Sequence, residues 1–420
     1  MLKNKIIVGK DVVATLPELI QKANIKKPFI VADKNTYKAA GENVCSLLAG
    51  AEIVYSLYVI DHEMPEPDEY TVGSVMMHFD KACDLVVGIG SGVINDVCKI
   101  LSNISGTQYY IVATAPSMDG YASATSSMSR DGLKISLPSK SADVIIGDIE
   151  ILKSAPDRML LAGLGDMLAK YISICDWRIA HIVTGEYYSE EIAQMVRDSL
   201  KRCVDHASGL LKREDAAIKA VFEGLVNTGL AMALAGVSRP ASGVEHYFSH
   251  IWDMRGLEFG TRVDLHGIQC GTATLLSIKL FEQIKQMKPD REKALAYAES
   301  FNFTKWSETL RELLGKGAEA MIALEAKEQK YDLEKHKVRL EAILAHWEDI
   351  VAVMEEELPK AQQLEQLLLT LNAPTTVEEI GQKNELLPLV FMATKDIRDK
   401  YVLSRLAWDL GVIEELPSYL

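Results

Sequence analysis

Four residues in the second half of the chain have the types and spacing to hold a divalent metal ion. Asp166 lies in AGLGDMLAK, His246 and His250 lie in SRPASGVEHYFSH, and His266 lies in VDLHGIQCG. A carboxylate with two imidazoles suits zinc, nickel or iron and leaves a position open for a substrate. Because four residues separate His246 from His250, both fall on one face of a helix.

Two ligand sets fit this pattern. Either the histidine pair binds the ion together with Asp166, or one histidine of the pair binds with Asp166 and His266 while the other faces the substrate. Spacing alone does not decide between them. A single histidine is ordinarily a satisfied core or surface residue. Asp166 is harder to explain that way, because a carboxylate among apolar residues costs free energy unless a cation or donor meets it.

A glycine loop joins a predicted strand to a predicted helix. Gly88, Gly90 and Gly92 lie where DLVVGIG passes into SGVINDVCKI. Glycines let the backbone approach a pyrophosphate, and the N–H groups at a helix N-terminus favour an anion. The spacing is G-x-G-x-G and the loop follows a later strand, so it matches the usual dinucleotide fingerprint poorly. The alternative is a tight turn that binds nothing.

Polar residues follow two other predicted strands. Asp33 ends PFIVAD, where a carboxylate can accept from an adenosine ribose, or can simply cap the following turn. In TAPSMDGYASATSSM, Thr114 and Ser117 are placed to bind a nicotinamide amide or ribose, and Asp119 to accept from a substrate hydroxyl. The alternative for this segment is a solvated Ser/Thr loop.

The elements that must position these residues change type along the chain. Up to about residue 150, apolar runs alternate with helical patterns; the runs are KPFIVAD, AEIVYSLYVI, CDLVVGIG, YYIVATAP and ADVIIGD. Such alternation predicts βα units around a mainly parallel sheet. From roughly Ser154 onward the apolar period is that of helices. We therefore expect an α/β domain at residues 1–153 and a helical domain at 154–420.

Composition supports a folded protein of two domains that does not act on polyanions. The chain has 420 residues, 48% hydrophobic and 25% charged, and a formal charge of -14. The length favours two sizeable domains, and the charge argues against a nucleic-acid or anionic-membrane surface. The N-terminus has no signal-peptide pattern and no long apolar run occurs, so we expect a cytoplasmic protein without membrane insertion.

The six cysteines are scattered. No C-x-x-C pair occurs, and several cysteines sit inside apolar runs. This pattern is typical of reduced core cysteines, and it predicts neither a disulfide framework nor a thiolate metal site.

Together these segments resemble one family. GIGSGVINDVCK, TAPSMDGYAS, GLGDMLAK, SRPASGVEH and DLHG are similar to segments of the sn-glycerol-1-phosphate dehydrogenases, especially their bacterial AraM-like branch. These enzymes group with glycerol dehydrogenase, iron-containing alcohol dehydrogenases and dehydroquinate synthase. The resemblance runs from about residue 5 to DIRDKYVLSRLAWDLG near the C-terminus. It implies a dehydroquinate-synthase-like fold, with a Rossmann-like N-terminal sheet domain and an all-helical C-terminal domain, and a homodimer.

The resemblance also implies roles for individual residues. It assigns the metal to Asp166, His246 and His266, with zinc, nickel or iron as the ion. It places His250 beside the substrate and Asp119 in contact with it. Asp119, Asp166 and His250 are then the catalytic set. The residues implied to bind NAD(H) or NADP(H) are Asp33, Gly90, Gly92, Val93, Ile94, Asn95, Asp96, Thr114, Ser117 and Ser123.

The function implied is reduction of dihydroxyacetone phosphate by NAD(P)H to sn-glycerol 1-phosphate, a step of phospholipid metabolism. Three alternatives remain at this stage: a dehydrogenase of glycerol or another unphosphorylated polyol, a dehydroquinate-synthase-like lyase, and a non-catalytic binding protein. Arg239, Arg255 and Arg262 are candidates for binding the substrate phosphate. The chain departs from the family at Ile89 and Ser91, where glycines are common, and at Asn95, where an aliphatic residue is common.

Overall fold

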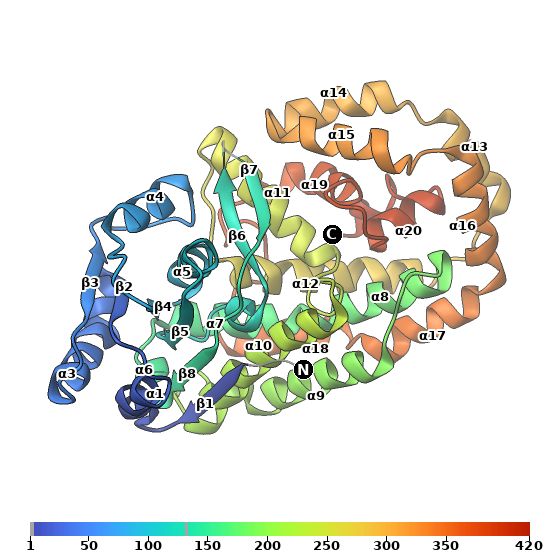
Figure 1. The fold of residues 1–420 in the computed structure, drawn as a ribbon. Coiled ribbons are helices and arrows are strands. Elements are labelled where there is room, and N and C mark those ends of the chain that lie inside the picture. The colour runs from blue at the N-terminus through green and yellow to red at the C-terminus, as the bar shows by residue number, and fades with distance from the viewer. Residues whose placement is uncertain (1–3, 131–132) are drawn as a thin grey trace. The chain divides into compact units, whose positions relative to one another are not determined.

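The computed structural model describes residues 4–130 and 133–420, and its chain forms two compact units (Figure 1). Unit 1 comprises Met1–Met167 and Asp198–Gly236, and unit 2 comprises Leu168–Arg197 and Val237–Leu420. The change from strands to helices falls near residue 150, as the sequence indicates. The compact units nevertheless do not follow a single cut at residue 153, because helices from beyond that point belong to unit 1. The functional division between 1–153 and 154–420 stays a prediction.

The centre of unit 1 is a parallel sheet. Within the described residues it has six strands in the order β1-β8-β5-β4-β2-β3. The strands are β1 (Lys5–Gly9), β2 (Pro28–Asp33), β3 (Ser56–Ile60), β4 (Leu85–Gly90), β5 (Gln108–Ala113) and β8 (Val144–Asp148). β2, β4 and β8 are buried along their whole length, which explains their continuous apolar runs. The predicted α/β fold with a mainly parallel sheet is confirmed.

Helices cover both faces of this sheet. On one face, Val87 and Val112 pack in a core with Leu16 of α1 (Leu16–Lys22) and Leu48 of α3 (Glu42–Gly50). On the other face, α5 (Gly92–Ser105) packs against β4 and β5, and α10 (Asp215–Ala235) places Phe222 against Gly147 of β8. Since α10 closes the sheet core although it comes late in the chain, unit 1 extends past the predicted boundary.

The remaining elements of unit 1 are short helices and one ribbon. The helices are α2 (Lys34–Thr36), α4 (Glu69–His78), α6 (Ile149–Lys153), most of α7 (Asp157–Leu168) and the end of α9 (Glu190–His206). β6 (Thr125–Arg130) and β7 (Leu133–Pro138) form an antiparallel pair. The sequence predicts a polar loop where β6 lies. Its Ser and Thr side chains lack the apolar alternation that marks a half-buried strand, so the period gave no signal.

Every regular element of unit 2 is a helix, and all its residues are described (Figure 1). The helices are α8 (Lys170–Thr184), the start of α9, α11 (Val244–Phe259), α12 (His266–Ile284), α13 (Arg291–Ser300), α14 (Phe303–Leu314), α15 (Gly317–Glu328), α16 (Leu333–Ala345), α17 (Trp347–Glu357), α18 (Ala361–Thr370), α19 (Leu387–Thr394) and α20 (Leu403–Asp409). α11 and α12 pack against each other. This agrees with the helical periodicity from Ser154 onward.

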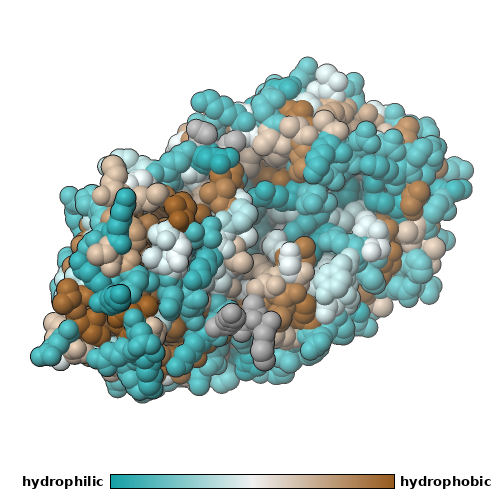
Figure 2. Space-filling view, viewed as in Figure 1, coloured by the Kyte–Doolittle hydropathy of each residue, from teal (hydrophilic) through white to brown (hydrophobic). Residues whose placement is uncertain are grey.

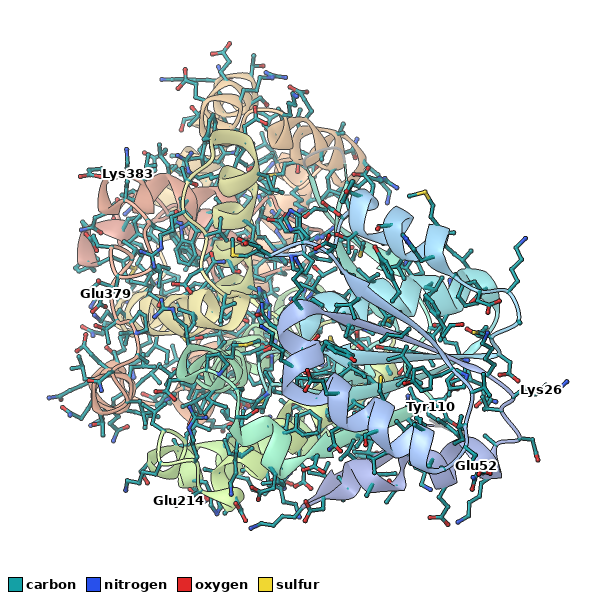
Figure 3. All side chains as sticks on the ribbon, turned by 90° about the vertical axis from the view of Figure 1, so that its left-hand side faces the viewer. Lys26, Glu52, Tyr110, Glu214, Glu379 and Lys383 are labelled. Carbon is teal, nitrogen blue, oxygen red and sulfur yellow. The ribbon has the colours of Figure 1, made fainter. Side chains whose placement is uncertain are left out.

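Charged side chains cover much of the surface. Figure 2 shows a mostly hydrophilic face with scattered apolar side chains, and Figure 3 shows charged residues such as Lys26, Glu52 and Lys383 pointing outward. Among the described residues, α10 is the helix long and apolar enough to cross a membrane, but 61% of its apolar window is buried inside the fold. A buried core helix passes the same test.

Gly163 of α7 provides a test of how tightly the fold holds the segment after β5. A Cβ at this position would overlap the carbonyl oxygen of Pro116 and lie 3.0 Å from Val221 Cγ1. We expect Gly163→Ala to lower the free energy of unfolding by about 1–3 kcal/mol through overpacking. Chemical denaturation measures this change. Gly73→Ala, also within a helix but with nothing within 4 Å of the added Cβ, is the control and should be neutral or stabilising. Equal stabilities for both variants would contradict the packing described.

Candidate active site

The polar loops of unit 1 gather at the carboxyl edge of its sheet. Gly90 pairs with Ala113 at the ends of β4 and β5, and Val31 pairs with Gly88, which brings Asp33 to the same level. From β2 the chain passes outward to β3, whereas from β4 it passes the opposite way to β5. The carboxyl ends of β2 and β4 therefore flank the topological switch point, where open α/β sheets bind their ligands.

The glycine loop is shaped by close backbone packing. A Cβ on Gly90 would lie 2.5 Å from Ile94 Cβ, so this position requires glycine for the strand to pass directly into α5. Ser91 is the N-cap of α5, and Gly92 is its first residue. The N–H groups of this first helical turn form an anion-binding end. The Ile94 and Asn95 side chains are buried in the protein, and the Asn95 N–H donates to Ser91 O, so a cofactor contact of Val93, Ile94 and Asn95 stays a prediction.

Hydrogen bonds tie the glycine loop to the segment after β5. The hydroxyls of Ser91 and Ser117 are 2.5 Å apart, and Thr114 N–H donates to Gly90 O. Asn95 Nδ2 donates to Gly120 O, while Asn95 Oδ1 accepts from Tyr109. The predicted cofactor residues of these two segments therefore lie together in unit 1. Asn95, the departure from the family pattern, links the two segments with its side-chain amide.

The side chain of Lys99 anchors the segment after β5 by hydrogen bonds. Its Nζ donates to Gly120 O at 2.6 Å, to Ser123 Oγ at 3.0 Å and to Thr125 O at 2.9 Å. The side chain is fully buried, and burial lowers its pKa. Asp96, one turn earlier on α5, approaches Nζ at 3.4 Å and accepts from Ser127 N–H; burial raises its pKa. The Ser123 hydroxyl, predicted to contact the cofactor, is thus already part of an internal network.

Asp166 and Asp119 meet within unit 1. Asp166 lies on α7, is fully buried, and accepts from the backbone N–H of Asp119 through Oδ2 at 2.9 Å. Gly163 lies one turn earlier on α7, against the carbonyl of Pro116. The helix therefore contacts the segment after β5 at both Pro116 and Asp119. A buried carboxylate needs a hydrogen-bond donor or a cation, and the Asp119 N–H is one such partner of Asp166.

Asp33 acts as a helix cap. Its Oδ1 accepts from the N–H groups of Asn35 and Thr36, and Thr36 Oγ1 accepts from Asp33 N–H. The cap reading is therefore correct. It does not exclude a ribose contact, since Oδ2 takes part in neither of these two bonds; that contact stays a prediction.

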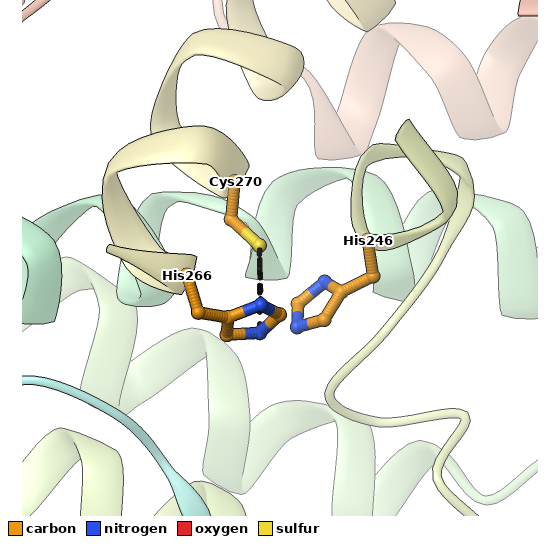
Figure 4. A group of neighbouring side chains, drawn as sticks. All are labelled: His246, His266 and Cys270. Atoms are coloured by element: carbon orange, nitrogen blue, oxygen red, sulfur yellow. Dashed lines mark hydrogen bonds between the residues drawn. The ribbon is translucent and has the colours of Figure 1, made fainter. Parts of the chain in front are cut away.

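In unit 2, α11 and α12 bring the three predicted histidines together. Figure 4 shows two of them, His246 and His266, side by side, with Cys270 next to His266. The ring centroids of His246 and His266 are 5.0 Å apart, and those of His250 and His266 are 6.2 Å apart. His266 is the first residue of α12, and His246 lies in the first turn of α11. Spacing had left open which histidine joins His246; both candidates lie nearby, so the ligand choice stays a prediction.

Hydrogen bonds orient two of these rings. His246 Nδ1 lies 2.6 Å from Glu245 Oε1, and His266 Nδ1 lies 3.0 Å from Ser249 Oγ. Because Nδ1 of each ring is hydrogen-bonded, Nε2 is the nitrogen left to bind a metal. This is the usual arrangement of metal-binding histidines. Both imidazoles therefore suit a divalent ion.

A network of buried polar groups supports His246. Glu245 also accepts from Gly243 N–H, and burial raises its pKa to about 7. Asp176 of α8 accepts from the N–H groups of Val244 and Leu403, so it joins the N-termini of α11 and α20. Burial, with Glu245 nearby, raises the pKa of Asp176 to about 8.

The arginines considered for a substrate phosphate differ in availability. Arg239 is buried, binds both carboxylate oxygens of Glu186 and donates to Tyr401 O. Arg255 donates to Leu313 O and lies over the Phe259 ring. Arg262 is exposed. Arg239 is thus a structural residue, and Arg262 is the most accessible of the three.

Three polar residues near the predicted site were missed by sequence reasoning: Lys99, Glu245 and Cys270. Glu245 precedes a predicted ligand directly, which is a visible signal for an orienting carboxylate. Cys270 follows His266 by four residues, which places both on one helix face. Lys99 carried no signal, because an isolated lysine on a helix is usually exposed.

A family model matches part of the chain, and solved structures share its fold. The model described as iron-containing alcohol dehydrogenase matches residues 7–156. A probable glycerol dehydrogenase from Sinorhizobium meliloti superposes with a TM-score of 0.64 at 15% identity, over 99% of this chain and 97% of that one. A sulfoacetaldehyde reductase from Bifidobacterium kashiwanohense, in complex with NAD+, gives 0.63 at 15% identity, over 100% and 97%. The chain has the fold of these two solved proteins.

Curated relatives narrow the class. The glycerol-1-phosphate dehydrogenase (NAD(P)+) of Halalkalibacterium halodurans is 33% identical over 284 residues, covering 67% of this chain and 71% of the relative. The enzyme of the same name from Pyrococcus furiosus is 32% identical over 310 residues, covering 74% and 82%. The chain belongs to the family of glycerol-1-phosphate dehydrogenases and is an oxidoreductase, as the resemblance in its motifs implies.

The Glu245–His246 bond predicts a dependence of metal affinity on a residue that is not a ligand. We expect Glu245→Gln to weaken zinc binding about 10- to 100-fold, because the ring loses the carboxylate that fixes its tautomer. Competition with a chromophoric chelator measures this affinity. Glu258→Gln, on the same helix but three turns further on, is the control and should bind zinc normally. Unchanged affinity in Glu245→Gln would show that the carboxylate does not orient the ligand.

Proposed function

We propose that this protein reduces dihydroxyacetone phosphate to sn-glycerol 1-phosphate with NAD(P)H. The observation that carries the proposal is a cluster of oriented histidines in a chain of the glycerol-1-phosphate dehydrogenase family. The curated relatives bear this activity in their names. The carboxyl edge of the unit 1 sheet supports the nucleotide part of the reaction, since it combines a glycine loop with a helix N-terminus.

The proposed metal ligands are Asp166, His246 and His266. A buried carboxylate and two imidazoles with engaged Nδ1 atoms match the preferences of zinc and nickel, with iron also compatible. His250 is placed beside the substrate in this proposal, because its ring lies further from His266 than that of His246 does.

The proposed cofactor site uses backbone and hydroxyl groups. Gly90, Gly92 and the first turn of α5, with Val93, Ile94, Asn95 and Asp96, hold the pyrophosphate. Thr114 and Ser117 face the nicotinamide, and Ser123 supports them from within the Lys99 network. Asp33 accepts from the adenosine ribose through Oδ2.

In the proposed mechanism the protein positions the substrate and moves one proton. When bound, the ion supplies Lewis acidity at the carbonyl and NAD(P)H supplies the hydride. Asp119 accepts a hydrogen bond from a substrate hydroxyl and so orients the carbonyl. His250 donates the proton that the product hydroxyl gains, a task suited to an imidazole near neutral pH.

We also propose that the enzyme is a cytoplasmic homodimer that does not insert into membranes. Family membership supports the homodimer, and the largely buried α10 supports the second point. A polyol dehydrogenase for an unphosphorylated substrate is the nearest rival, because the likeness to glycerol dehydrogenases shows only the fold.

Metal removal with a product assay tests the proposal. We expect chelator-stripped protein to lose NADH oxidation with dihydroxyacetone phosphate and to regain it on addition of zinc or nickel. The product should be glycerol 1-phosphate, which a stereospecific assay distinguishes from glycerol 3-phosphate. Dihydroxyacetone is the matched control substrate and should react far more slowly. Full activity of metal-free protein would refute the metal role, and a preference for dihydroxyacetone would favour the rival.

Two histidine variants test the assignment of ligands. We expect His266→Ala to lose the bound ion and all activity, because one of three ligands is gone. His250→Ala should retain the ion, as measured by metal analysis, and lose about 10²–10⁴-fold in kcat, the range for a missing proton donor. The reverse pattern, with the ion lost from His250→Ala and kept in His266→Ala, would exchange the two roles.

A further inference from the structure

A stripe of polar side chains runs along α5 behind the glycine loop. Ser91, Asn95 and Lys99 follow one another at intervals of four residues, which places them on one face of the helix. The Asn95 and Lys99 side chains are fully buried, and Ser91 is 8% exposed. The stripe therefore faces the interior of unit 1, where each polar group needs a partner.

The first two members of the stripe bond to the beginning of the segment that follows β5. The hydroxyl of Ser91 lies 2.5 Å from that of Ser117, and it makes no cap bond to α5 although Ser91 is the N-cap. An N-cap serine ordinarily accepts from the first helical turn, so this hydroxyl joins the two segments and does not take up the N–H groups of the turn. Asn95 Nδ2 donates to Gly120 O at 3.1 Å.

Lys99 bonds to the rest of the same segment. Its Nζ donates to the carbonyl of Gly120, the hydroxyl of Ser123 and the carbonyl of Thr125. The bonds of the stripe thus follow the same order along both segments, from residue 91 to 99 on the helix and from 117 to 125 beyond β5. The helix that begins at the glycine loop and the segment after β5 are tied together along this whole length.

These bonds fix the backbone on one side of Asp119, and Asp166 fixes it on the other. Gly120 O accepts from both Asn95 Nδ2 and Lys99 Nζ. The N–H of Asp119 itself donates to Asp166 Oδ2. The residue predicted to orient the substrate is therefore held at its own N–H and at the carbonyl of the next residue.

Stability alone does not account for a lysine in this place. Taking an ammonium group out of water costs free energy, and burial lowers the pKa of Lys99 although the Asp96 carboxylate at 3.4 Å acts in the opposite direction. Well-packed apolar side chains often replace buried charges without loss of stability. An ammonium group provides something that they do not, because its three donors hold three acceptors in one arrangement.

We propose that Lys99, assisted by Asn95, is a positioning residue that holds the Asp119 segment in a fixed place relative to the N-terminus of α5. Lys99 touches neither substrate nor cofactor in this role. The inference rests on the proposed function, which places the cofactor pyrophosphate at the start of α5 and a substrate hydroxyl at Asp119. Because a displacement of about 1 Å at a reacting centre can cost about 10²-fold in rate, a loosened segment lowers turnover more than cofactor affinity.

Removal of the ammonium group tests this role. We expect Lys99→Met, a substitution of similar length, to lower kcat for dihydroxyacetone phosphate about 10- to 100-fold, because the Asp119 segment loses its bonds to Nζ. The dissociation constant of NADH, measured by fluorescence titration, should stay close to that of the wild type, because the glycine loop is intact. Asn95→Ala removes the other bond to Gly120 O and should lower kcat by a smaller factor.

Lys395→Met is the matched control for the loss of a buried lysine. Lys395 lies in unit 2, is 1% exposed, donates to Met392 O and lies over the Trp306 ring. This variant should have a lower melting temperature and an unchanged kcat and KM. Hydrogen exchange, followed by mass spectrometry in peptides that cover residues 114–127, should be faster than in the wild type for Lys99→Met and unchanged for Lys395→Met.

A double-variant cycle separates positioning from a loss of folded protein. We expect Lys99→Met to lower kcat much less in an Asp119→Ala background than in the wild type, because a residue that acts through Asp119 then has nothing left to position. A purely structural effect would lower kcat by the same factor in both backgrounds.

The outcomes separate this inference from the proposed function. A wild-type kcat in folded Lys99→Met, or equal factors in the two backgrounds, would overturn the positioning role and leave the proposed function intact. Should Lys99→Met fail to fold, Asn95→Ala decides, and an unchanged kcat with unchanged hydrogen exchange in that variant would overturn the role. Absence of NADH oxidation with dihydroxyacetone phosphate by the wild-type protein would overturn the proposed function, and this inference with it.

Discussion

Burial of both faces of a parallel sheet is the constraint on which the cofactor half of the molecule depends. Parallel strands need a crossover after each strand, and here crossover helices bury the two faces together with α10 from later in the chain. All carboxyl ends consequently meet at one edge, where each strand must hand over to a loop or a helix N-terminus. Backbone N–H and C=O groups that have no partner in the sheet lie at this edge. They include the N–H groups at the end of β4 and in the first turn of α5.

In unit 2, carboxylates and a histidine are buried among helices, where they need hydrogen-bond partners. Backbone N–H groups donate to these carboxylates: Gly243 donates to Glu245, and Val244 and Leu403 donate to Asp176. These bonds give the buried carboxyl groups hydrogen-bond partners and fix the start of α11. His246 is therefore held in one orientation by the protein itself, before any ion binds. A site prepared in this way loses little conformational freedom on binding its ligand.

The sequence predicted the elements whose pattern is local. The buried strands appear as continuous apolar runs, and the helices of unit 2 as a 3.6-residue period. It did not predict β1, or β6, whose Ser and Thr residues resemble a loop. The extent of unit 1 escaped prediction because Phe222 meets Gly147 only in the folded chain.

The same distinction holds for the candidate site. Histidines and the buried Asp166 stand out by residue type and surroundings, so the sequence singles them out, and their role as ligands stays a prediction. Lys99 and Glu245 act by orienting other groups, and such roles depend on contacts between segments that no spacing rule reveals. The sequence allows two roles for Asp33, a helix cap and a contact to the adenosine ribose. The structure shows the cap.

That cap has a consequence for the evolution of cofactor choice. A carboxylate at the end of the second strand disfavours the 2′-phosphate of NADP, and the simplest route to accept that phosphate is to replace it. In the proposed cofactor site Asp33 is this carboxylate, and it also caps the start of α2, so its replacement removes a cap worth about 1 kcal/mol. Selection for a new coenzyme at this position would have to find a compensating mutation elsewhere, or retain a Ser, Thr or Asn that caps without the charge.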